Sequence, residues 1–373
     1  MKPLRIILIL LILLNTDSCI ISYVPQIGAT DETLVVEGLI TDQPGVNTIR
    51  ISKSQPMWKS GIPKPLTGCI ASVSDDLGNS FKVKETALFG IYVTDPAVFH
   101  GVAGRIYTLH IRTTTEAVNL SYESLPMKMI PVPPIDSIYY EKKTFGQSNM
   151  PVEGCNIFLN THDPTNNCKF YRWEYSETWE FHIILDFPNK ICWITNNPAE
   201  INIKNGSLLA EPFIKKQPVI TITNPVDRLS VKYSILVNQF SMNENEYFYW
   251  EGLKNTISQT GGLYDLVPAA IPNNLFCIEE PYKKVLGFFS VSAVSAKRLF
   301  IKDKFAGTNT LYGNCLSDTI FTARPDTVTF FGTVIKVLSD RTPPGIIYTN
   351  DRGCVDCTTR GSNIKPVFWD DGK

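Results

Sequence analysis

The most regular pattern in the chain is a two-residue alternation of apolar and polar positions. Within residues 105–113, Tyr107, Leu109 and Ile111 alternate with polar residues, which places one face of a β-strand on a core and the other towards solvent. Similar short stretches, rich in β-branched or aromatic residues and separated by turn-forming residues, are 34–41, 48–52, 68–74 and 80–85. This spacing predicts an immunoglobulin-like β-sandwich over residues 34–125.

A cluster of prolines follows this region. Four of the nine residues 126–134 are proline, and proline cannot donate to a sheet ladder, so we expect a linker there. Beyond it, the strand-like stretches are 135–141, 168–184, 231–238, 284–301 and 327–338. They predict a larger β-rich domain over residues 135–373, and a mainly β fold class for the whole chain.

One stretch of the second region has helical periodicity. Ser241 stands three residues before Glu244, which is the spacing of a capping box. Gly261 and Gly262 mark an end. The apolar stripe between them consists of Trp250, Leu253 and Ile257. We therefore expect one inserted helix near residues 244–258. The helix is expected to cover an edge or an end of the second sheet. The alternative is that its apolar surface binds a partner protein.

The first 18 residues have the pattern of a secretion signal. Lys2 and Arg5 precede an apolar run at 6–14, and Ser18 stands just before Cys19. The run rises only about 13 Å as a helix, too short for a hydrocarbon core of roughly 30 Å. Cleavage before Cys19 would leave that cysteine as the N-terminus, where it can carry a lipid, with residues 19–33 as anchor and tether. The alternative is an ordinary cleaved signal peptide, since Thr16 replaces the usual leucine.

Export changes the interpretation of the cysteines. With Cys19 lipidated, eight of the nine remain, an even number that allows up to four disulfides in an oxidising compartment, with the pairing left open. They are Cys69, Cys155, Cys168, Cys192, Cys277, Cys315, Cys354 and Cys357. The C-x-x-C spacing at 354–357 also fits half a zinc ribbon or a redox motif, but no second such pair and no βαβ pattern accompanies it. Structural disulfides are therefore the favoured interpretation.

Composition and motifs exclude several classes of function. Charged residues make up 19% of the chain and its formal net charge is −1, so neither a disordered tail nor a nucleic-acid binder with a basic stripe is predicted. The sequence lacks H-E-x-x-H, G-x-S-x-G, P-loop and G-x-G-x-x-G motifs. Its four histidines have no metal-site spacing. We therefore predict no metal, no cofactor and no catalytic residues.

Two groups of polar residues were weighed as alternatives to that prediction. His162 and Asp163 could form half of an acid–base or metal arrangement, but their proline- and asparagine-rich surroundings favour a turn. Glu174, Glu177 and Glu180 could supply the two carboxylates of a glycosidase. In a strand, Glu174 and Glu180 share one face while Glu177 points away, and a solvated sheet face explains them without catalysis.

The strongest binding candidate from the sequence alone is Trp58. It lies in a proline-stiffened loop at 53–67, where an exposed indole could stack on a sugar or anchor a partner. It could equally fold back onto its own sheet. Four other tryptophans lie in periodic segments and are predicted to be core residues, namely Trp173, Trp179, Trp193 and Trp250. Trp369 is expected to hold the C-terminal end down.

Nine short stretches, spaced along nearly all of the chain after the signal, form a specific set. They are Leu34-Val35-Val36-Glu37-Gly38, Ile40-Thr41-Asp42, Gly90-Ile91-Tyr92, Gly104-Arg105-Ile106-Tyr107, Ile135-Asp136-Ser137-Ile138, Gly261-Gly262-Leu263-Tyr264-Asp265, Val285-Leu286-Gly287-Phe288-Phe289, Cys354-Val355-Asp356-Cys357 and Lys365-Pro366-Val367-Phe368-Trp369. This set resembles an uncharacterised family of Bacteroidota lipoproteins that is labelled domain of unknown function four-two-four-nine. No catalytic residues are established for this family, so the resemblance assigns none here.

The resemblance also implies a functional setting. Members are commonly encoded beside TonB-dependent receptors, which implies a role at the outer membrane in nutrient capture or receptor assembly. We expect a non-catalytic outer-membrane lipoprotein that works with such a receptor. The alternatives are an envelope hydrolase with a carboxylate-based site and a structural lipoprotein of envelope assembly. No acidic cluster follows Cys19, where Ile20-Ile21-Ser22-Tyr23 stands instead, so the face of the membrane stays open.

Overall fold

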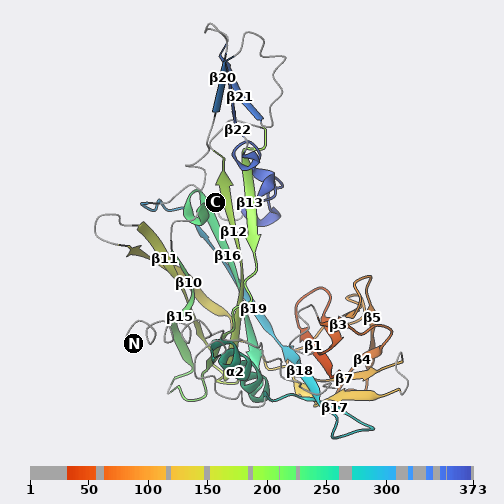
Figure 1. Ribbon diagram of the computed structural model, residues 1–373. Helices are drawn as coiled ribbons and strands as arrows, with labels where there is room; N and C mark the ends of the chain where they lie inside the picture. The colour runs from red at the N-terminus through yellow and green to blue at the C-terminus, as the bar shows by residue number, and fades with distance from the viewer. Residues whose placement is uncertain are drawn as a thin grey trace, which may run out of the picture.

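The protein is mainly β, as the sequence predicts. The structure, a computed structural model, describes residues 32–55, 63–114, 119–146, 152–183, 188–209, 211–223, 227–259, 271–307, 318–321, 333–338, 345–349 and 351–370. Figure 1 shows a first β-unit at the lower right, a second unit whose long strands run upwards from it, and a small sheet at the top. Within these ranges, no helix is both long and apolar enough to cross a membrane.

The first unit is one sheet of 11 strands in the order β17-β8-β7-β4-β5-β6-β2-β1-β18, with β3 paired to β2 and β9 to β7. The strands are β1 (Leu34–Thr41), β2 (Thr48–Lys53), β3 (Lys64–Pro65), β4 (Ile70–Asp75), β5 (Ser80–Glu85), β6 (Ile91–Thr94), β7 (Ile106–Arg112), β8 (Ser121–Ser124), β9 (Met127–Lys128), β17 (Leu275–Cys277) and β18 (Val285–Ser292). The sheet encloses a single apolar cluster. The described strands are thus hydrogen-bonded into one sheet, where the sequence predicted an immunoglobulin-like sandwich of two.

Alternation along the strands sets which side chains enter this core. Tyr107, Leu109 and Ile111 of β7 are all buried, as their spacing predicts. Strand β1 follows the same rule, since Leu34, Val36 and Ile40 are buried while Glu37 points outwards. The outer faces of β1 and β2 therefore remain available to line a site.

The division of the chain differs from the predicted boundary at residues 126–134. Strands β17 and β18 lie in the first sheet although they fall within the predicted second domain, 135–373. Met127 and Met129, from the predicted linker, also belong to the first core. The cause is the parallel pairing of β1 with β18, from Leu34 opposite Val285 to Thr41 opposite Ser292. Alternation identifies a strand but does not say which sheet it joins.

The second unit contains two sheets around a second core. One sheet has the order β10-β11-β15, and the other has the order β13-β12-β16-β19 with β14 also paired to β12. The strands are β10 (Ile135–Phe145), β11 (Val152–His162), β12 (Phe170–His182), β13 (Ile191–Asn196), β14 (Asn202–Asn205), β15 (Phe213–Ile222), β16 (Lys232–Met242) and β19 (Val294–Ile301). Tyr171, Trp173 and Tyr175 share the buried face of β12, as their spacing predicts.

One long segment joins the two units. Strands β18 and β19 follow each other with only Ala293 between them, so the segment leaves the first sheet and enters the second without a loop (Figure 1). Ser241 holds the crossing point, because its hydroxyl accepts from Ala293 N at 3.1 Å and its own amide donates to Ala293 O at 3.1 Å. Val294 N donates to Asp42 at 2.9 Å, which ties the crossing to the end of β1.

The predicted helix is present as α2 (Glu244–Gln259), but its start differs from the prediction. Ser241 is the penultimate residue of β16 and bonds at the crossing point, so it does not cap the helix. The first helical turn follows Asn243, whose carbonyl accepts from Tyr247 N at 3.0 Å. The predicted stripe is also displaced, since Ile257 is exposed while Glu246 and Tyr247 are buried. Residues 261 and 262 lie outside the described ranges.

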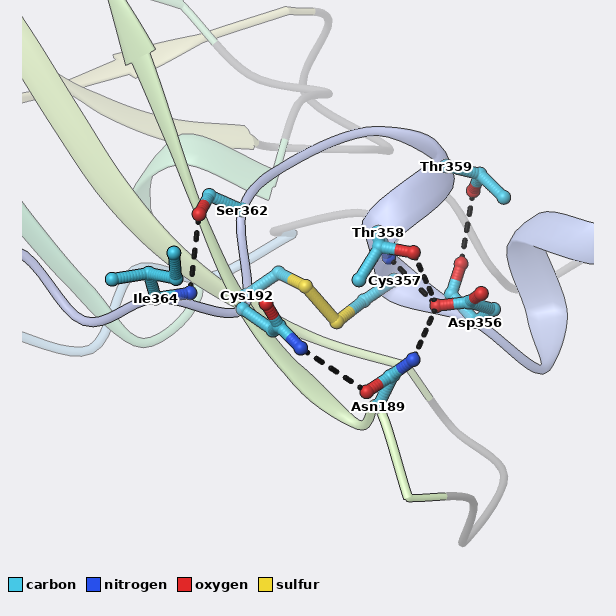
Figure 2. The surroundings of a disulfide bond; sticks show 9 residues. Asn189, Cys192, Asp356, Cys357, Thr358, Thr359, Ser362 and Ile364 are labelled. Carbon is cyan, nitrogen blue, oxygen red and sulfur yellow. Dashed lines mark hydrogen bonds between the residues drawn. A yellow bond between two sulfur atoms is a disulfide. The ribbon is translucent and has the colours of Figure 1, made fainter.

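The C-terminal segment returns onto the second unit. A small sheet of β20 (Asp318–Phe321), β22 (Gly345–Thr349) and β21 (Thr333–Leu338) precedes three 3-10 helices, which are η3 (Arg352–Cys354), η4 (Cys357–Thr359) and η5 (Val367–Asp370). Figure 2 shows the disulfide between Cys192 of β13 and Cys357 of η4. Trp369 is buried and donates from Nε1 to Glu180 at 2.9 Å. This tryptophan holds the C-terminal end on the sheet, as expected.

The other cysteines divide into two groups. Cys354 is also disulfide-bonded, and Cys315 lies outside the described residues. The sequence favours disulfides among all eight cysteines, but four of them are buried thiols in the structure. These are Cys69, Cys155, Cys168 and Cys277. Burial raises the pKa of Cys155 and of Cys168 to about 12, so both behave as small apolar residues. The even number of cysteines could not predict which of them stay reduced, because it does not say which sulfur atoms lie close enough to bond.

We expect the β1–β18 pairing to depend on Gly287. Its φ is +91°, and an added Cβ would lie 2.0 Å from the carbonyl oxygen of Val36 on the paired strand. Gly287→Ala should therefore destabilise the protein by more than about 3 kcal/mol. Gly104 is a matched control, because its φ is +92° and nothing lies within 4 Å of its added Cβ; Gly104→Ala should cost only about 1–2 kcal/mol. Equal losses of stability in urea unfolding would contradict the pairing.

The disulfide also makes a measurable contribution. Replacing both Cys192 and Cys357 by alanine should destabilise the native state by about 2–4 kcal/mol, because the unfolded chain loses a constraint that closes a long loop. Thermal unfolding by circular dichroism in non-reducing buffer measures the change. Peptide mapping of the unmodified protein without reductant should recover both cysteines on one cross-linked fragment, and recovery on separate fragments would contradict the assignment.

Candidate functional site

A cleft of about 530 Å³ lies where the two units and helix α2 meet. The first unit contributes residues of β1, β2 and β18, the second contributes two residues of β12, and the helix supplies the remaining wall. The lining residues are Glu37, Gly38, Leu39, Thr48, Arg50, Arg172, Glu174, Tyr249, Trp250, Leu253, Phe288 and Ser290. Binding sites commonly occur at such junctions between units.

The cleft continues at both ends. A second hollow of about 460 Å³ shares Glu37 and Arg50 with it and extends over Phe89 and Ile91 of the first unit. A third of about 170 Å³ shares Arg172, Glu174 and Trp250 and extends to residues 198–201 of the second unit. The three hollows thus form one groove across both units.

Arginine and glutamate occur in pairs along this groove. Arg50 Nη1 lies 3.1 Å from Glu37 Oε2 on the exposed outer face of β1 and β2. Arg172 forms an ion pair with Glu174 two residues along β12. Each pair offers hydrogen-bond donors beside acceptors, and the formal charges of each pair cancel.

Arg172 is held by aromatic rings. Its side chain is only 5% exposed, and its Cζ lies 4.4 Å from the ring centroid of Phe240 and 4.6 Å from that of Trp250. Such stacking favours arginine over lysine, because the guanidinium is planar and weakly hydrated. Its Nε is buried without a hydrogen-bond partner among the described residues. The guanidinium is therefore fixed in place with part of its bonding capacity unused.

Glu246 of helix α2 lies directly behind the lining. It is fully buried, and this burial raises its pKa to about 7, against the opposing effects of the Arg172 charge and of bonds from Ser290 and Trp250. Its Oε1 accepts from Trp250 Nε1 at 3.4 Å, whereas its Oε2 has no partner among the described residues. A buried carboxyl left half-bonded is costly, which marks this part of the interface as a functional candidate.

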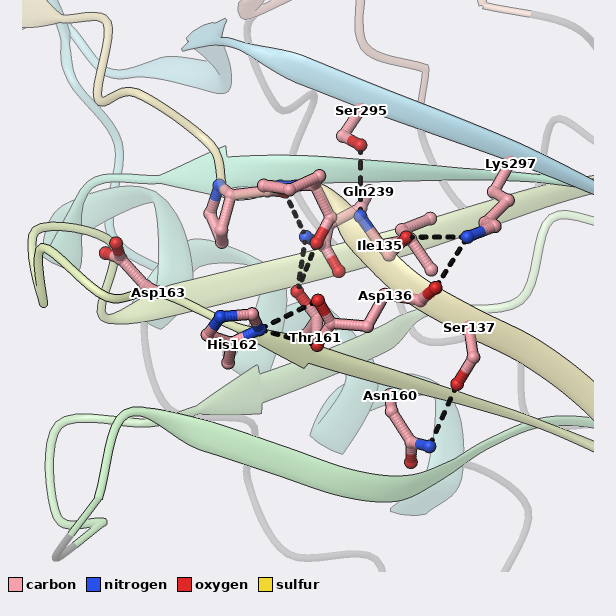
Figure 3. Close-up of polar contacts among 12 residues, drawn as sticks. Ile135, Asp136, Ser137, Asn160, Thr161, His162, Asp163, Gln239, Ser295 and Lys297 are labelled. Atoms are coloured by element: carbon pink, nitrogen blue, oxygen red, sulfur yellow. Dashed lines mark hydrogen bonds and ion pairs between the residues drawn. The ribbon is translucent and has the colours of Figure 1, made fainter.

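The sequence candidate His162 lies elsewhere. Its Nδ1 lies 2.7 and 2.8 Å from the two carboxylate oxygens of Asp136 on the neighbouring strand β10 (Figure 3). Asp163 turns away and accepts from Thr165 N at 3.0 Å and from Cys168 N at 2.7 Å. The turn interpretation of Asp163 is therefore confirmed, and the two residues do not form one site.

The three glutamates of β12 separate as well. Glu174 reaches the cleft, and Glu180 pairs with His182 at 2.7 Å. Glu177 is fully buried, where it accepts from Tyr233 Oη at 2.9 Å and from Asn196 Nδ2 at 2.9 Å. The expectation of a solvated face is therefore wrong for Glu177. This residue lies on the core face of β12, where hydrogen bonds from Tyr233 and Asn196 compensate for the burial of its carboxylate.

Several sequence candidates lie outside the described residues, namely Cys19, Trp58 and Cys315. Within the described ranges, no group of three His, Cys, Asp or Glu side chains could hold a metal ion. Sequence reasoning missed the groove residues Glu37, Arg50 and Arg172 and the buried Glu246 behind them. Two of these, Arg172 and Glu246, share a signal, which is a charged side chain inside an otherwise aromatic segment. Arg172 lies in such a segment of β12, and Glu246 lies in another at the start of α2.

We expect Glu246 to make stability depend on pH. Its pKa rises from 4.5 to about 7 on folding, so its neutral form stabilises the fold below pH 4.5, and this contribution of about 3 kcal/mol is lost as the pH rises through 7. Glu246→Gln keeps the shape without the charge. It should match the unmodified protein near pH 4.5 and exceed it in stability near pH 8, measured by urea unfolding.

The exposed Glu244 of the same helix provides the matched control. Glu244→Gln makes the same chemical change at an exposed position and should not reproduce the gain in stability near pH 8. Parallel profiles for the unmodified protein and Glu246→Gln would contradict the burial of an ionisable carboxyl at this interface.

Comparison with known proteins places this groove in a family context. No curated protein matches the chain. A family model described as "Domain of unknown function (DUF4249)" matches residues 21–298. The matched region includes every residue that lines the groove and ends within β19, before the small sheet and the C-terminal helices. Since the match covers most of the sequence, the chain belongs to the DUF4249 family.

Proposed function

We propose that this chain is a non-catalytic outer-membrane lipoprotein that binds its ligand in the interdomain groove, as an accessory component of a TonB-dependent receptor in nutrient uptake. The observation that carries the binding role is the groove itself, with aromatic side chains, two arginine–glutamate pairs and an Arg172 guanidinium held against Phe240 and Trp250. Family membership supports the setting, and the signal pattern before Cys19 supports the lipid anchor.

Binding fits the groove better than catalysis. The two carboxylates in the main cleft, Glu37 and Glu174, are each paired with an arginine. A general acid or base must reach a proton of the substrate, and these carboxylates already have cationic partners. Preorganised paired side chains instead suit recognition through several simultaneous hydrogen bonds.

One observation favours the second candidate, an envelope hydrolase. Glu246 has a pKa of about 7, which is near the optimum for a general acid at neutral pH. It is nevertheless fully buried behind Trp250 and Ser290 and does not line the cleft. A hydrolase would show turnover that Glu246→Gln abolishes, whereas a binding protein shows none in either form. A structural role in envelope assembly would instead show neither turnover nor a small ligand.

The proposal is tested on the native protein. A C-terminally tagged chain is extracted from outer membranes in mild detergent, and we expect a TonB-dependent receptor to be recovered with it in stoichiometric amount. Intact mass should show a lipid at Cys19, and Cys19→Ala should remain soluble after the membranes are removed. Recovery of lipidated protein alone would overturn the receptor partnership, and an unmodified Cys19 would overturn the anchor.

A further inference from the structure

We propose that the groove recognises a neutral, linear oligosaccharide, an inference that rests on the proposed binding function and specifies its ligand class. Four features of the groove support it, namely its charge balance, its apolar surface, the absence of an open strand edge, and its length.

Charge balance argues against an anionic ligand. The main cleft contains two arginines and two glutamates, with Arg50 paired to Glu37 and Arg172 paired to Glu174. These formal charges cancel, and Glu200 in the third hollow adds one negative charge, so the lining offers no excess of positive charge to attract a phosphate or a carboxylate. A sugar hydroxyl both donates and accepts, so neighbouring hydroxyls can bond to a guanidinium and the adjacent carboxylate together.

The rest of the lining provides apolar surface. Tyr249 lines the cleft and packs on the buried Phe288 with ring centroids 4.9 Å apart, and Trp250 borders both the main cleft and the third hollow. Leu39 and Leu253 complete this surface. A sugar ring has an apolar C–H face and a polar rim, so it matches a site in which aromatic rings stand beside paired polar groups.

The position of the groove argues against a peptide that binds by strand addition. Strand β1 is hydrogen-bonded to β2 on one side and to β18 on the other. On the other edge of β18, the Asn274 side chain accepts from Phe289 N and donates to Phe289 O, each at 2.9 Å, and the Asn273 side chain donates to Val285 O. Strand β12 likewise has partners on both sides. Recognition must therefore come from side chains on a sheet face, without the backbone edge that strand addition requires.

The length of the groove selects a linear ligand. The second and third hollows continue the cleft in the two units, and they share Glu37 and Arg50 at one end and Arg172 with Trp250 at the other. A single sugar would occupy only part of this path. A chain of several sugars would contact both units together and pass over Arg172 and Trp250, which border both the main cleft and the third hollow.

The test uses the full-length lipidated protein in mild detergent. Native electrophoresis is run in gels that contain a neutral polysaccharide, namely starch, dextran, laminarin, xylan, galactomannan or inulin. Gels with polygalacturonate or heparin and titrations with a casein peptide digest test the charged and peptide alternatives. We expect retardation by at least one neutral polysaccharide, and isothermal titration with its hexasaccharide then gives the Kd.

Two variants locate the binding. Thr48 is exposed on β2 and lines the cleft, so Thr48→Trp should fill the cleft and weaken binding by about tenfold or more. Thr221 is exposed on β15, away from the groove lining, and Thr221→Trp should leave the Kd within about twofold of the unmodified value.

Each outcome decides between the alternatives. Failure to bind any of the six neutral polysaccharides, binding of anionic polysaccharides or peptides alone, or equal affinity in Thr48→Trp would overturn the inference. Recovery of the receptor from the same preparation, without neutral glycan binding, would leave the proposed function standing and the sugar assignment wrong. Absence of both would overturn the two together.

Discussion

The fold depends on a single strand that serves two sheets. Residues 285–301 pair with β1 in the first unit and with β16 in the second, and only Ala293 separates the two pairings. Because Ser241 and Asp42 bond to this crossing point, the units are joined by hydrogen-bonded β-structure in place of a flexible linker. Their relative position is fixed by the same bonds that build the sheets, and so is the shape of the groove between them.

The groove is therefore a product of the junction and belongs to neither unit alone. The first unit presents Glu37 and Arg50 on an outer sheet face, the second presents Arg172, and α2 closes the space with Trp250. The half-bonded Glu246 and Arg172 destabilise this interface in isolation. Their retention is understandable if the junction is selected for recognition, since binding sites often carry a cost in stability.

Sequence patterns identified half of the described strands, because a two-residue period directly reflects burial on one face. The bounds of β1 and β5 match their predicted stretches, and α2 lies where helical periodicity placed it. The pairing of the strands could not be predicted. The apolar and polar positions of β18 do not indicate whether its partner lies in the first sheet or in the second. Ser241 shows the same limit, because a serine near a helix start can bond to a distant strand instead. Trp250 was assigned to the core because periodicity separates buried from exposed faces but does not locate a cleft between units.

The parallel pairing of β1 with β18 has a consequence for how the chain reaches its native state. The first strand pairs early with β2 but finds its second partner only after residue 285 has been made, so the N-terminal unit cannot complete its sheet during synthesis of its own segment. Contacts of this sequence separation slow folding and leave strand edges open in the meantime. The protein must therefore fold as a whole after its chain is nearly complete, and a truncated N-terminal fragment should be a trap for aggregation and unusable as an independent module.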